Sequence, residues 1–521
     1  MNRNLIGFIS ILLIGSIAIV GTYFGLPWWQ AYQQKASSDA AGARGTLTIG
    51  VDNWIGYFPL CGKEMRKRMH DAGYLLKCID DGADYPGRMK KLRSGELDLA
   101  VATVDSFLLN GAKENFPGTV IMVIDESKGG DAIVARAARI ASIDDLKNKP
   151  SYKIALTPDS PSEHLLKAVS VHFDVPQLRS QQTAWRQDVG GSSEALAQLT
   201  TGNVDVAVLW EPDVTKALAN KEFVKILGTD NTEKLIVDVL LASHDTNQRK
   251  ADTIAILLAN YFRVLKFYRD NEGNLVDEIR AGVKLSEPQI TAMLRGVKWV
   301  NLAENARFWF GIGTGMSLAS EGLVDTLESA AQILVDAGDF SSSPIPNRDP
   351  YRLQHSRFIE SLYTQGDAGL FGNMASTETV GSTDSNTLKD LPASVWNKLI
   401  EVGTLRIRPI NFQSGTAELS QEGKLELDAA AENLKHYPNF RVVVKGHTGL
   451  RGDPAANTTL SAQRAASVRK YLMVTHQIAA ERLHAVGLGA DQPLKRSADE
   501  SDRAYEYRLP RVELYLVSDA L

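Results

Sequence analysis

Residues 92–101 read LRSGELDLAV, and residues 199–208 repeat the same pattern as LTTGNVDVAV. Each copy is typical of the last turn of a helix, a glycine near its C-cap, and then a strand buried on both faces. The copies begin 107 residues apart, whereas solenoid repeats recur about every 20 to 50 residues. The repeat therefore predicts two similar α/β lobes.

The residues around the repeat show the same alternation. Apolar residues 46–52 predict a first buried strand, residues 64–70 a helix and residues 75–79 a second strand. Short apolar strands that alternate with helices predict a parallel α/β sheet. Helical patterns dominate after residue 240 and end with residues 317–337.

Bulk composition argues for an ordinary globular protein with more than one domain. The chain has 521 residues, 44% of them hydrophobic and 23% charged, and a formal net charge of -5. A chain this long exceeds what one hydrophobic core usually organises. It lacks a basic stripe, so we expect no nucleic-acid partner.

The beginning of the chain predicts a membrane anchor. Leu5 to Gly25 is an uncharged, mostly apolar run of 21 residues, and about 20 helical residues span a bilayer core. Arg3 precedes the run, which favours a cytoplasmic N-terminus by the positive-inside tendency, and Trp28-Trp29 follows it at the depth where aromatic belts lie. We expect a single-pass protein of a bacterial inner membrane, with the bulk of the chain in the periplasm.

Two points about export stay open at this stage. A cleaved signal peptide is the alternative to an anchor, although the nearest small-x-small site, Ala41 to Ala43, lies far beyond the apolar run. Cys61 and Cys78 are the two cysteines of the chain. An exported compartment would permit them to pair, but the spacing does not decide between a disulfide and two buried thiols.

Changes in composition divide the chain into five parts. Residues 339–390 contain stretches rich in Ser, Thr, Gly and Pro, which are typical of a linker. A new α/β pattern begins near residue 405. We expect an anchor with its flank at 1–30, a stalk at 31–45, a two-lobed solute-binding domain at 46–345, a linker at 346–395 and a second α/β domain at 396–521.

Polar and aromatic side chains follow the predicted strands of both lobes. In open parallel sheets, ligands bind beyond the carboxyl ends of the strands. The candidate ligand-binding residues on this ground are Asn53, Trp54, Tyr57, Asp105, Ser106, Trp210 and Glu211.

A predicted helix start adds Ser160 and Ser162 to these candidates. Ser160 is placed as the N-cap and Pro161 as the first helical residue. Free backbone N–H groups at a helix start attract an anion, but Glu163 completes a capping box and would repel one. Because Asp105 and Glu211 could instead meet an ammonium group, the sign of the ligand's charge stays open.

This domain resembles the periplasmic substrate-binding proteins of the nitrate, sulfonate and taurine ABC-transporter class. The resemblance rests on four segments in a fixed order: GVDNWIGY at 50–57, DESKGGDAIV at 125–134, SIDDLK at 142–147 and LWEP at 209–212. It implies a small solute, for example a sulfonate or a taurine-like zwitterion, and an ABC permease as partner.

The resemblance does not imply catalysis. An enzyme branch of the same class makes the thiamine pyrimidine precursor, but its cysteine-rich signature is missing from a chain with two separated cysteines. The sequence also shows no Ser-His-Asp set, metal-spaced His/Cys cluster or phosphate-binding Gly loop. We therefore expect no enzyme activity, no cofactor and no metal.

Residues 396–521 resemble OmpA-like peptidoglycan-binding domains. The matching segments include INF at 410–412, RVVVKGHT at 441–448 and GLGADQP at 487–493. In that family a diaminopimelate side chain of peptidoglycan is held. The resemblance assigns its carboxylate to Arg464, whose planar fork suits two-point recognition, and implies supporting roles for Thr448, Asn457 and Arg511.

Two departures weaken that implication. Gly449 replaces the family's aspartate after His-Thr, and Pro510 replaces an arginine. Losing one charge-assisted contact costs roughly 1.5 to 3 kcal/mol, or about 10- to 150-fold in affinity. The alternative is therefore an envelope scaffold whose OmpA-like domain binds a protein partner.

A motor stator subunit would combine an anchor with a wall domain in the same way. Such a subunit needs an ionisable residue in its membrane helix, and Leu5 to Gly25 has none.

The sequence as a whole predicts a non-enzymatic, membrane-tethered solute receptor that contacts peptidoglycan and serves uptake or sensing.

Overall fold

The computed structural model describes residues 43–149, 151–179, 183–283, 285–313, 321–365, 388–413, 416–496 and 500–518. Within these ranges, no helix combines the length and the hydrophobicity needed to cross a bilayer. The predicted anchor, Leu5 to Gly25, lies outside the described residues.

Lobe I is built on a six-stranded sheet in the order β11-β4-β10-β3-β1-β2. Its strands are β1 (Gly45–Val51), β2 (Tyr74–Asp80), β3 (Leu99–Thr103), β4 (Gly118–Ser127), β10 (Val237–Ser243) and β11 (Val297–Trp299). Its helices include α3 (Phe58–Cys61), α4 (Lys63–Asp71), α5 (Tyr85–Ser94), α6 (Val104–Lys113), α12 (His244–Arg249), α13 (Ala251–Asp270), α14 (Glu272–Arg280) and α16 (Leu302–Glu304).

Lobe II is built on a five-stranded sheet in the order β7-β6-β8-β5-β9. Its strands are β5 (Asp131–Arg136), β6 (Ile154–Leu156), β7 (Arg186–Asp188), β8 (Val206–Trp210) and β9 (Phe223–Gly228). The helices around it are α7 (Ile143–Asn148), α8 (Pro161–His172), α9 (Pro176–Arg179), α10 (Ser192–Thr201) and α11 (Asp213–Leu218), and α15 (Glu287–Leu294) contacts α11.

The repeated decapeptide occupies the same place in both lobes, as predicted. In lobe I, helix α5 ends at Gly95, which has a left-handed φ of 79° and precedes the fully buried β3. In lobe II, α10 ends at Gly202, with φ of 80°, before the equally buried β8. A left-handed C-cap favours glycine, because a residue with a Cβ is strained in this conformation.

Both sheets are mixed, so the expectation of a purely parallel sheet was wrong. β1 pairs parallel with β2 and β3, but β10 runs antiparallel to β3 and β4. In lobe II, β5 runs antiparallel to β8 and β9. The reason is that the chain enters each sheet from the other lobe, and these crossing strands run in the opposite direction.

Two chain crossings form the hinge between the lobes. The first, Lys128 to Gly130, joins β4 to β5, and the second joins β9 to β10. The Ser127 and Thr229 hydroxyls, one from each crossing, lie 2.7 Å apart. Gly129 has a left-handed φ of 121°, a conformation that glycine adopts most readily. The hinge therefore holds the two crossings side by side.

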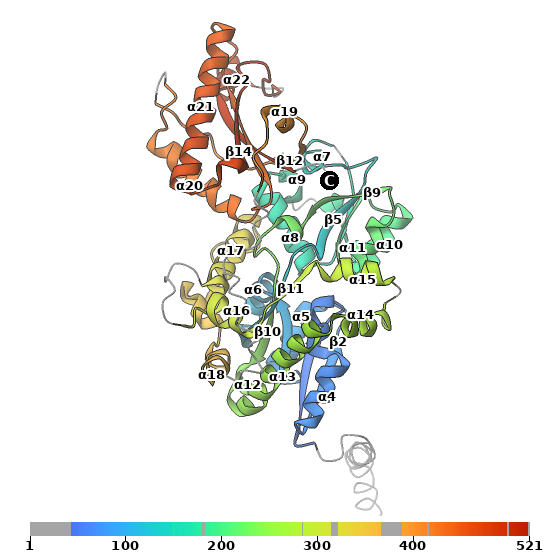
Figure 1. Cartoon of the computed structure of the whole chain (residues 1–521). Coiled ribbons are helices and arrows are strands. Elements are labelled where there is room, and N and C mark those ends of the chain that lie inside the picture. The colour runs from blue at the N-terminus through green and yellow to red at the C-terminus, as the bar shows by residue number, and fades with distance from the viewer. Residues whose placement is uncertain are drawn as a thin grey trace, which may run out of the picture.

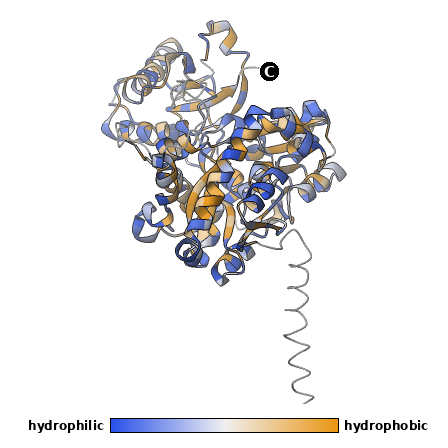
Figure 2. Cartoon of the chain, turned by 60° about the horizontal axis from the view of Figure 1, so that its bottom comes forward, coloured by the Kyte–Doolittle hydropathy of each residue, from blue (hydrophilic) through white to orange (hydrophobic). Residues whose placement is uncertain are grey.

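The packed part of the binding domain extends past residue 345, where the sequence suggests a linker. Residues 350–353 form η7 (Pro350–Leu353), and α18 (Arg357–Gln365) buries Phe358, Ile359 and Leu362 in the core of lobe I. Three regularly spaced apolar residues let α18 cover α13. Figure 2 shows the strands as largely hydrophobic and the outer helix faces as largely hydrophilic.

The C-terminal domain, called the wall domain below, has a four-stranded sheet in the order β12-β15-β13-β14. Its strands are β12 (Ile400–Thr404), β13 (Arg441–His447), β14 (Leu483–Gly487) and β15 (Arg511–Ser518), and its helices are α19 (Ala393–Trp396), α20 (Gln421–Lys435), α21 (Pro454–Thr475) and α22 (Asp502–Arg508).

The wall domain packs on lobe II, at the end away from lobe I (Figure 1). The His172 ring of α8 lies 2.8 Å from the Tyr437 hydroxyl and stacks on His436 at 5.6 Å between ring centroids. Backbone hydrogen bonds from Arg406 to His172 and from Glu233 to His436 join the same surfaces. Burial lowers the pKa of His172 to about 3, so this interface is made by a neutral ring.

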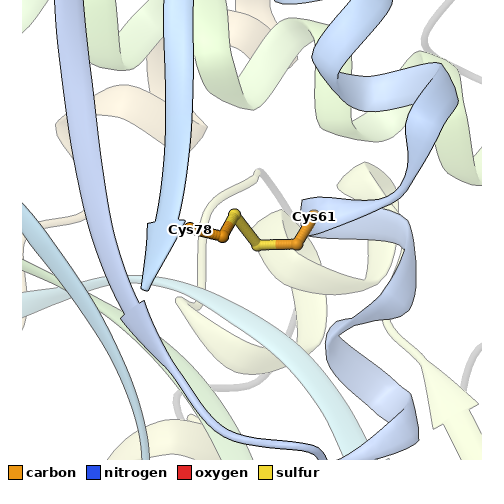
Figure 3. The surroundings of a disulfide bond; sticks show 2 residues. All are labelled: Cys61 and Cys78. Atoms are coloured by element: carbon orange, nitrogen blue, oxygen red, sulfur yellow. A yellow bond between two sulfur atoms is a disulfide. The ribbon is translucent and has the colours of Figure 1, made fainter. Parts of the chain in front are cut away.

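A disulfide joins Cys61, at the end of α3, to Cys78 in β2 (Figure 3). The pairing that the sequence leaves open is thus made in the fold, between cysteines 17 positions apart in the sequence. It ties the segment that follows β1 to the edge strand of lobe I.

We expect the Cys61→Ser, Cys78→Ser double variant to lose about 3 kcal/mol of unfolding free energy, because a loop of this length then becomes unrestricted in the unfolded chain. Urea unfolding of the oxidised wild type and the variant measures this. Dithiothreitol should destabilise the wild type and leave the variant unchanged, and equal sensitivity of both proteins would contradict the assignment.

Candidate functional site

A narrow pocket lies where the two lobes meet, and both lobes contribute to its walls. Its free volume is about 10 Å³ in this arrangement of the lobes, room for about one water molecule. Lobe II and its crossings provide Asp131, Pro161, Trp210 and Ile236, and the remaining lining residues, all from lobe I, are Asp52, Trp54, Tyr57, Tyr85, Thr103 and Asp238. The pocket thus contains four aromatic and three acidic side chains.

Two aromatic residues of the η2 region (Ile55–Tyr57) are held by buried carboxylates. The Trp54 indole N–H donates to Asp125 at 3.2 Å, and the Tyr57 hydroxyl donates a short hydrogen bond to Asp238. Gly56 lies between them because a Cβ there would approach Asp125 and the Trp54 ring to 2.2 Å. The two hydrogen bonds hold the rings against the sheet.

A third ring connects the lobes directly. The Trp210 indole N–H of lobe II donates to the Asn53 side chain of lobe I at 2.9 Å. Trp210 is 3% exposed and lies at the end of β8, paired with Asp131 across the sheet. This bond spans the cleft and belongs to the closed arrangement of the lobes.

Arg88 supplies the positive charge of this region. Its guanidinium is fully buried and contacts Asp81 at 2.6 Å and Asp52 at 3.1 Å. It also donates to the Val101 carbonyl at 3.0 Å and lies 4.8 Å from the Tyr85 ring centroid. Because two carboxylates share Arg88, it leaves no surplus positive charge for the pocket.

Asp125 and Asp238 form a carboxyl pair on neighbouring strands. They are direct partners across the β4–β10 ladder, and both are buried. Burial raises the pKa of Asp125 to about 8, although the Trp54 and Asp238 hydrogen bonds oppose this, and burial together with Asp125 raises the pKa of Asp238. Two like charges this close do not both ionise, so the pair holds a proton at neutral pH.

Asp131 is the acidic residue of lobe II in the pocket wall. Burial raises its pKa to about 7, the Ser127 hydrogen bond lowers it, and the charges of Asp105, Glu211 and Asp52 raise it further. Within the described ranges, Asp131 has no ion-pair partner.

Of the nine predicted ligand-binding residues, Trp54, Tyr57 and Trp210 line the pocket. The other six lie around it and are engaged elsewhere or face neighbouring groups. Asn53 accepts from Trp210, Ser106 caps α6 by bonding Thr103, and Glu211 accepts from the Thr215 backbone and hydroxyl. Asp105 lies in the first turn of α6 and is 3% exposed.

The start of α8 is satisfied by its own residues. Ser160 accepts from the Ser162 N–H, and Glu163 accepts from the Asp159 N–H at 2.7 Å. Glu163 also pairs with Arg186 at 2.7 Å, so its pKa is lowered despite burial. This arrangement gives no support to an anion at the helix start, because its caps and a carboxylate already occupy that end.

Sequence reasoning missed Asp131 and Asp238, which lie at the amino ends of β5 and β10. Since these strands run antiparallel to their neighbours, their first residues reach the same sheet edge as the carboxyl ends of β3 and β8. Asp52 and Thr103 end parallel strands and follow the rule used for the other candidates. Tyr85 begins α5 and has no comparable local signal.

The four predicted residues of the wall domain lie on helix α21 and at adjacent ends of β13 and β15. Asn457 and Arg464 lie on α21, and Thr448 follows β13 beside Arg511, the first residue of β15. The Thr448 N–H donates to Gly489, whose own N–H donates to Ser461 of α21. The loop after β13 is thereby fastened to α21.

Arg464 and Arg511 differ in whether a carboxylate of the protein pairs with them. The Arg464 Nε donates to the Thr416 carbonyl at 3.2 Å, and its guanidinium lies 5.0 Å from the Phe412 ring centroid. In the described ranges, no carboxylate lies within ion-pair distance of it. Arg511 instead bonds Glu513 at 2.7 Å. Burial by itself would raise the pKa of Glu513, but the neighbouring His447 and Arg511 side chains lower it to about 2.

The buried hydroxyl of Thr448 has no hydrogen-bond partner among the described residues. A Cβ on the neighbouring Gly449 would meet Pro510 at 4.0 Å, which is ordinary contact, and the φ of Gly449 is outside the left-handed region. The site therefore has room for a larger residue at position 449.

The family model described as "OmpA family" matches residues 411–506. The C-terminal domain is of the OmpA type. Over 101 residues it is 36% identical to the peptidoglycan-binding protein ArfA of Mycobacterium tuberculosis, a match that covers 19% of this chain and 31% of that protein. Over 85 residues it is 31% identical to the peptidoglycan-associated lipoprotein of Rhizobium meliloti, covering 16% and 48%.

This chain spans less than half the length of these curated relatives. The OmpA-type assignment thus applies to the wall domain, which in this chain is fused to a two-lobed α/β domain.

Solved structures share the two-lobed part at low identity. The aliphatic sulphonate binding protein SsuA from Escherichia coli aligns with a TM-score of 0.44 and 17% identity, covering 60% of this chain and 99% of that chain. The desulfurization enzyme DSZB aligns with a TM-score of 0.42 and 11% identity, covering 62% and 99%. Similarity at this level assigns neither a ligand nor an activity.

The raised pKa of Asp131 predicts a pH-dependent stability. A carboxyl whose pKa is near 7 when folded and about 3.9 when unfolded binds more protons in the folded chain, so stability falls as pH rises through that window. From pH 5.5 to 8.5, the wild type should lose about 2 kcal/mol relative to Asp131→Asn.

Urea unfolding of the dialysed full chain, followed by tryptophan fluorescence, measures this difference. The exposed Asp252→Asn variant is the control and should follow the wild type at every pH. Parallel pH curves for wild type and Asp131→Asn would show that Asp131 is not protonated in the fold near neutral pH.

Proposed function

We propose that this chain is a non-enzymatic solute receptor, tethered to a bacterial inner membrane and in contact with peptidoglycan. The observation that supports this best is the pocket between the lobes, which takes wall residues from both. A ligand held there shifts the lobes toward closure, because only the closed state offers both sets of contacts.

Three further features support an extracytoplasmic location. The disulfide between Cys61 and Cys78 suits an oxidising compartment. The OmpA-type wall domain is similar to proteins named for peptidoglycan, and Leu5 to Gly25 has the length and apolarity of a membrane anchor. A tethered receptor of this kind would pass its solute to an ABC permease beside it, or report the solute's presence.

In the wall domain, Arg464 would bind the carboxylate of diaminopimelate. Its guanidinium is partly exposed and lacks a carboxylate partner in the described part of the chain, which suits two-point recognition of an acid. Thr448 would offer its unpartnered hydroxyl beside Asn457, and Arg511 would hold the sheet edge through Glu513.

The second candidate function is an envelope scaffold whose wall domain binds a protein. Gly449 favours it, because this position lacks the acidic side chain that the family uses for the ammonium group of diaminopimelate. The two functions differ in their dependence on Arg464.

Sedimentation with purified peptidoglycan tests the wall contact. Arg464→Ala should lower the bound fraction of the full chain at least tenfold, since a charge-assisted bidentate contact is lost. Gly449→Asp should raise affinity roughly 10- to 150-fold by restoring an acid, and the open space at this position permits it.

Arg408→Ala is the matched control, because this arginine of the same domain is 85% exposed in its side chain. It should bind like the wild type. Binding that ignores both Arg464→Ala and Gly449→Asp would favour the scaffold function.

A ligand screen tests the receptor function. We expect at least one class among amines, carboxylates, sulfonates and phosphonates to raise the unfolding midpoint of the full chain, because a ligand of the folded state stabilises it. No shift by any class at millimolar concentration would count against a solute receptor.

A further inference from the structure

The pocket has an excess of buried acidic groups. Asp52, Asp131 and Asp238 line it, and Asp105, Asp125 and Glu211 lie behind them, all less than 8% exposed. In the described part of the chain, Asp52 alone among these six has a cation within ion-pair distance, and it shares Arg88 with Asp81. An anion placed in the pocket would meet uncompensated negative charge on both lobes.

One buried acceptor near the pocket has no protein partner. Asp105 Oδ1 accepts no hydrogen bond from the described residues, yet its charge acts on Asp131 in the pocket wall and on the buried His164 of α8. Both ring nitrogens of His164 also lack partners in the described structure. An unpaired buried carboxylate oxygen is expensive unless a bound group satisfies it.

The walls suit an organic cation better than a metal ion. Trp54, Tyr57, Tyr85 and Trp210 line the space with four rings, and aromatic faces attract ammonium groups. Among the described residues, no three His, Cys, Asp or Glu side chains are arranged to hold a metal. The free volume is about 10 Å³, so a ligand must be compact and the lobes must move apart to admit it.

We propose that the cleft ligand is a compact organic cation, whose ammonium group lies between Asp131 of lobe II and Asp52 and Asp238 of lobe I, against the aromatic rings. This inference rests on the proposed receptor function and names the class of its solute. The cation would draw the lobes together because it neutralises acids on both sides of the cleft.

Two probes with the same hydroxyethyl skeleton and opposite charge test the proposal: ethanolamine and isethionate. Choline adds a permanent cation and taurine a zwitterion. In thermal unfolding of the full chain at pH 8, ethanolamine or choline should raise the midpoint by several degrees, and isethionate should leave it unchanged.

Asp131→Asn identifies the site of this response. The variant removes a buried charge, so it should be at least as stable as the wild type at pH 8. Its apparent affinity for the cations should fall at least tenfold. Asp252→Asn, exposed on α13, should respond like the wild type.

A pH series with choline separates charge recognition from simple packing. Since burial raises the pKa of Asp131 to about 7, choline should bind about tenfold more weakly at pH 6 than at pH 8. Asp131→Asn should lose most of this dependence and keep only the part that comes from the Asp125–Asp238 pair.

The outcomes distinguish this inference from the receptor function itself. Stabilisation by isethionate or taurine above that by either cation overturns the cationic class but leaves a solute receptor. Stabilisation by a cation that persists in Asp131→Asn also overturns it, because the cation then binds without Asp131. If no probe and no compound of the wider screen shifts the midpoint, the receptor function fails as well.

Discussion

The buried guanidinium of Arg88 is the interaction on which the cleft depends. It binds Asp52 after β1, Asp81 after β2 and the Val101 carbonyl within β3, so one side chain of α5 joins three neighbouring strands. Removing one partner of a buried ion pair leaves an uncompensated charge and typically costs about 3 to 5 kcal/mol. Arg88 thus allows an edge crowded with acids to fold, because it neutralises part of the negative charge there.

Much of the two-lobed fold could be predicted from local pattern. The repeated decapeptide places a glycine at a left-handed helix end before a buried strand, and both copies do this. The pocket could be predicted only in part. Trp54 and Trp210 follow strands that end at the cleft, whereas Asp131 and Asp238 begin strands that cross from the opposite lobe. Strand direction depends on the chain path between lobes, which apolar periodicity does not record.

Contacts between segments that lie far apart in the sequence could not be predicted from it either. His172 and Tyr437 meet across a separation of 265 residues, and neither segment differs from an ordinary amphipathic helix end. The folding of α18 onto lobe I was missed because its apolar residues follow a Ser- and Pro-rich stretch that is typical of a linker. In the wall domain the reverse holds, since a dense series of motifs predicted its elements and only the consequence of Gly449 needs the geometry around it.

Helix α17 (Gly322–Ala337) packs against α6 of lobe I and α8 of lobe II, and its Ser329 hydroxyl lies 2.9 Å from His436 of the wall domain. This helix therefore contacts both lobes and the wall domain. Tilting the wall domain must either move the helix or break its hydrogen bond to His436, so the position of that domain and the angle between the lobes are mechanically coupled.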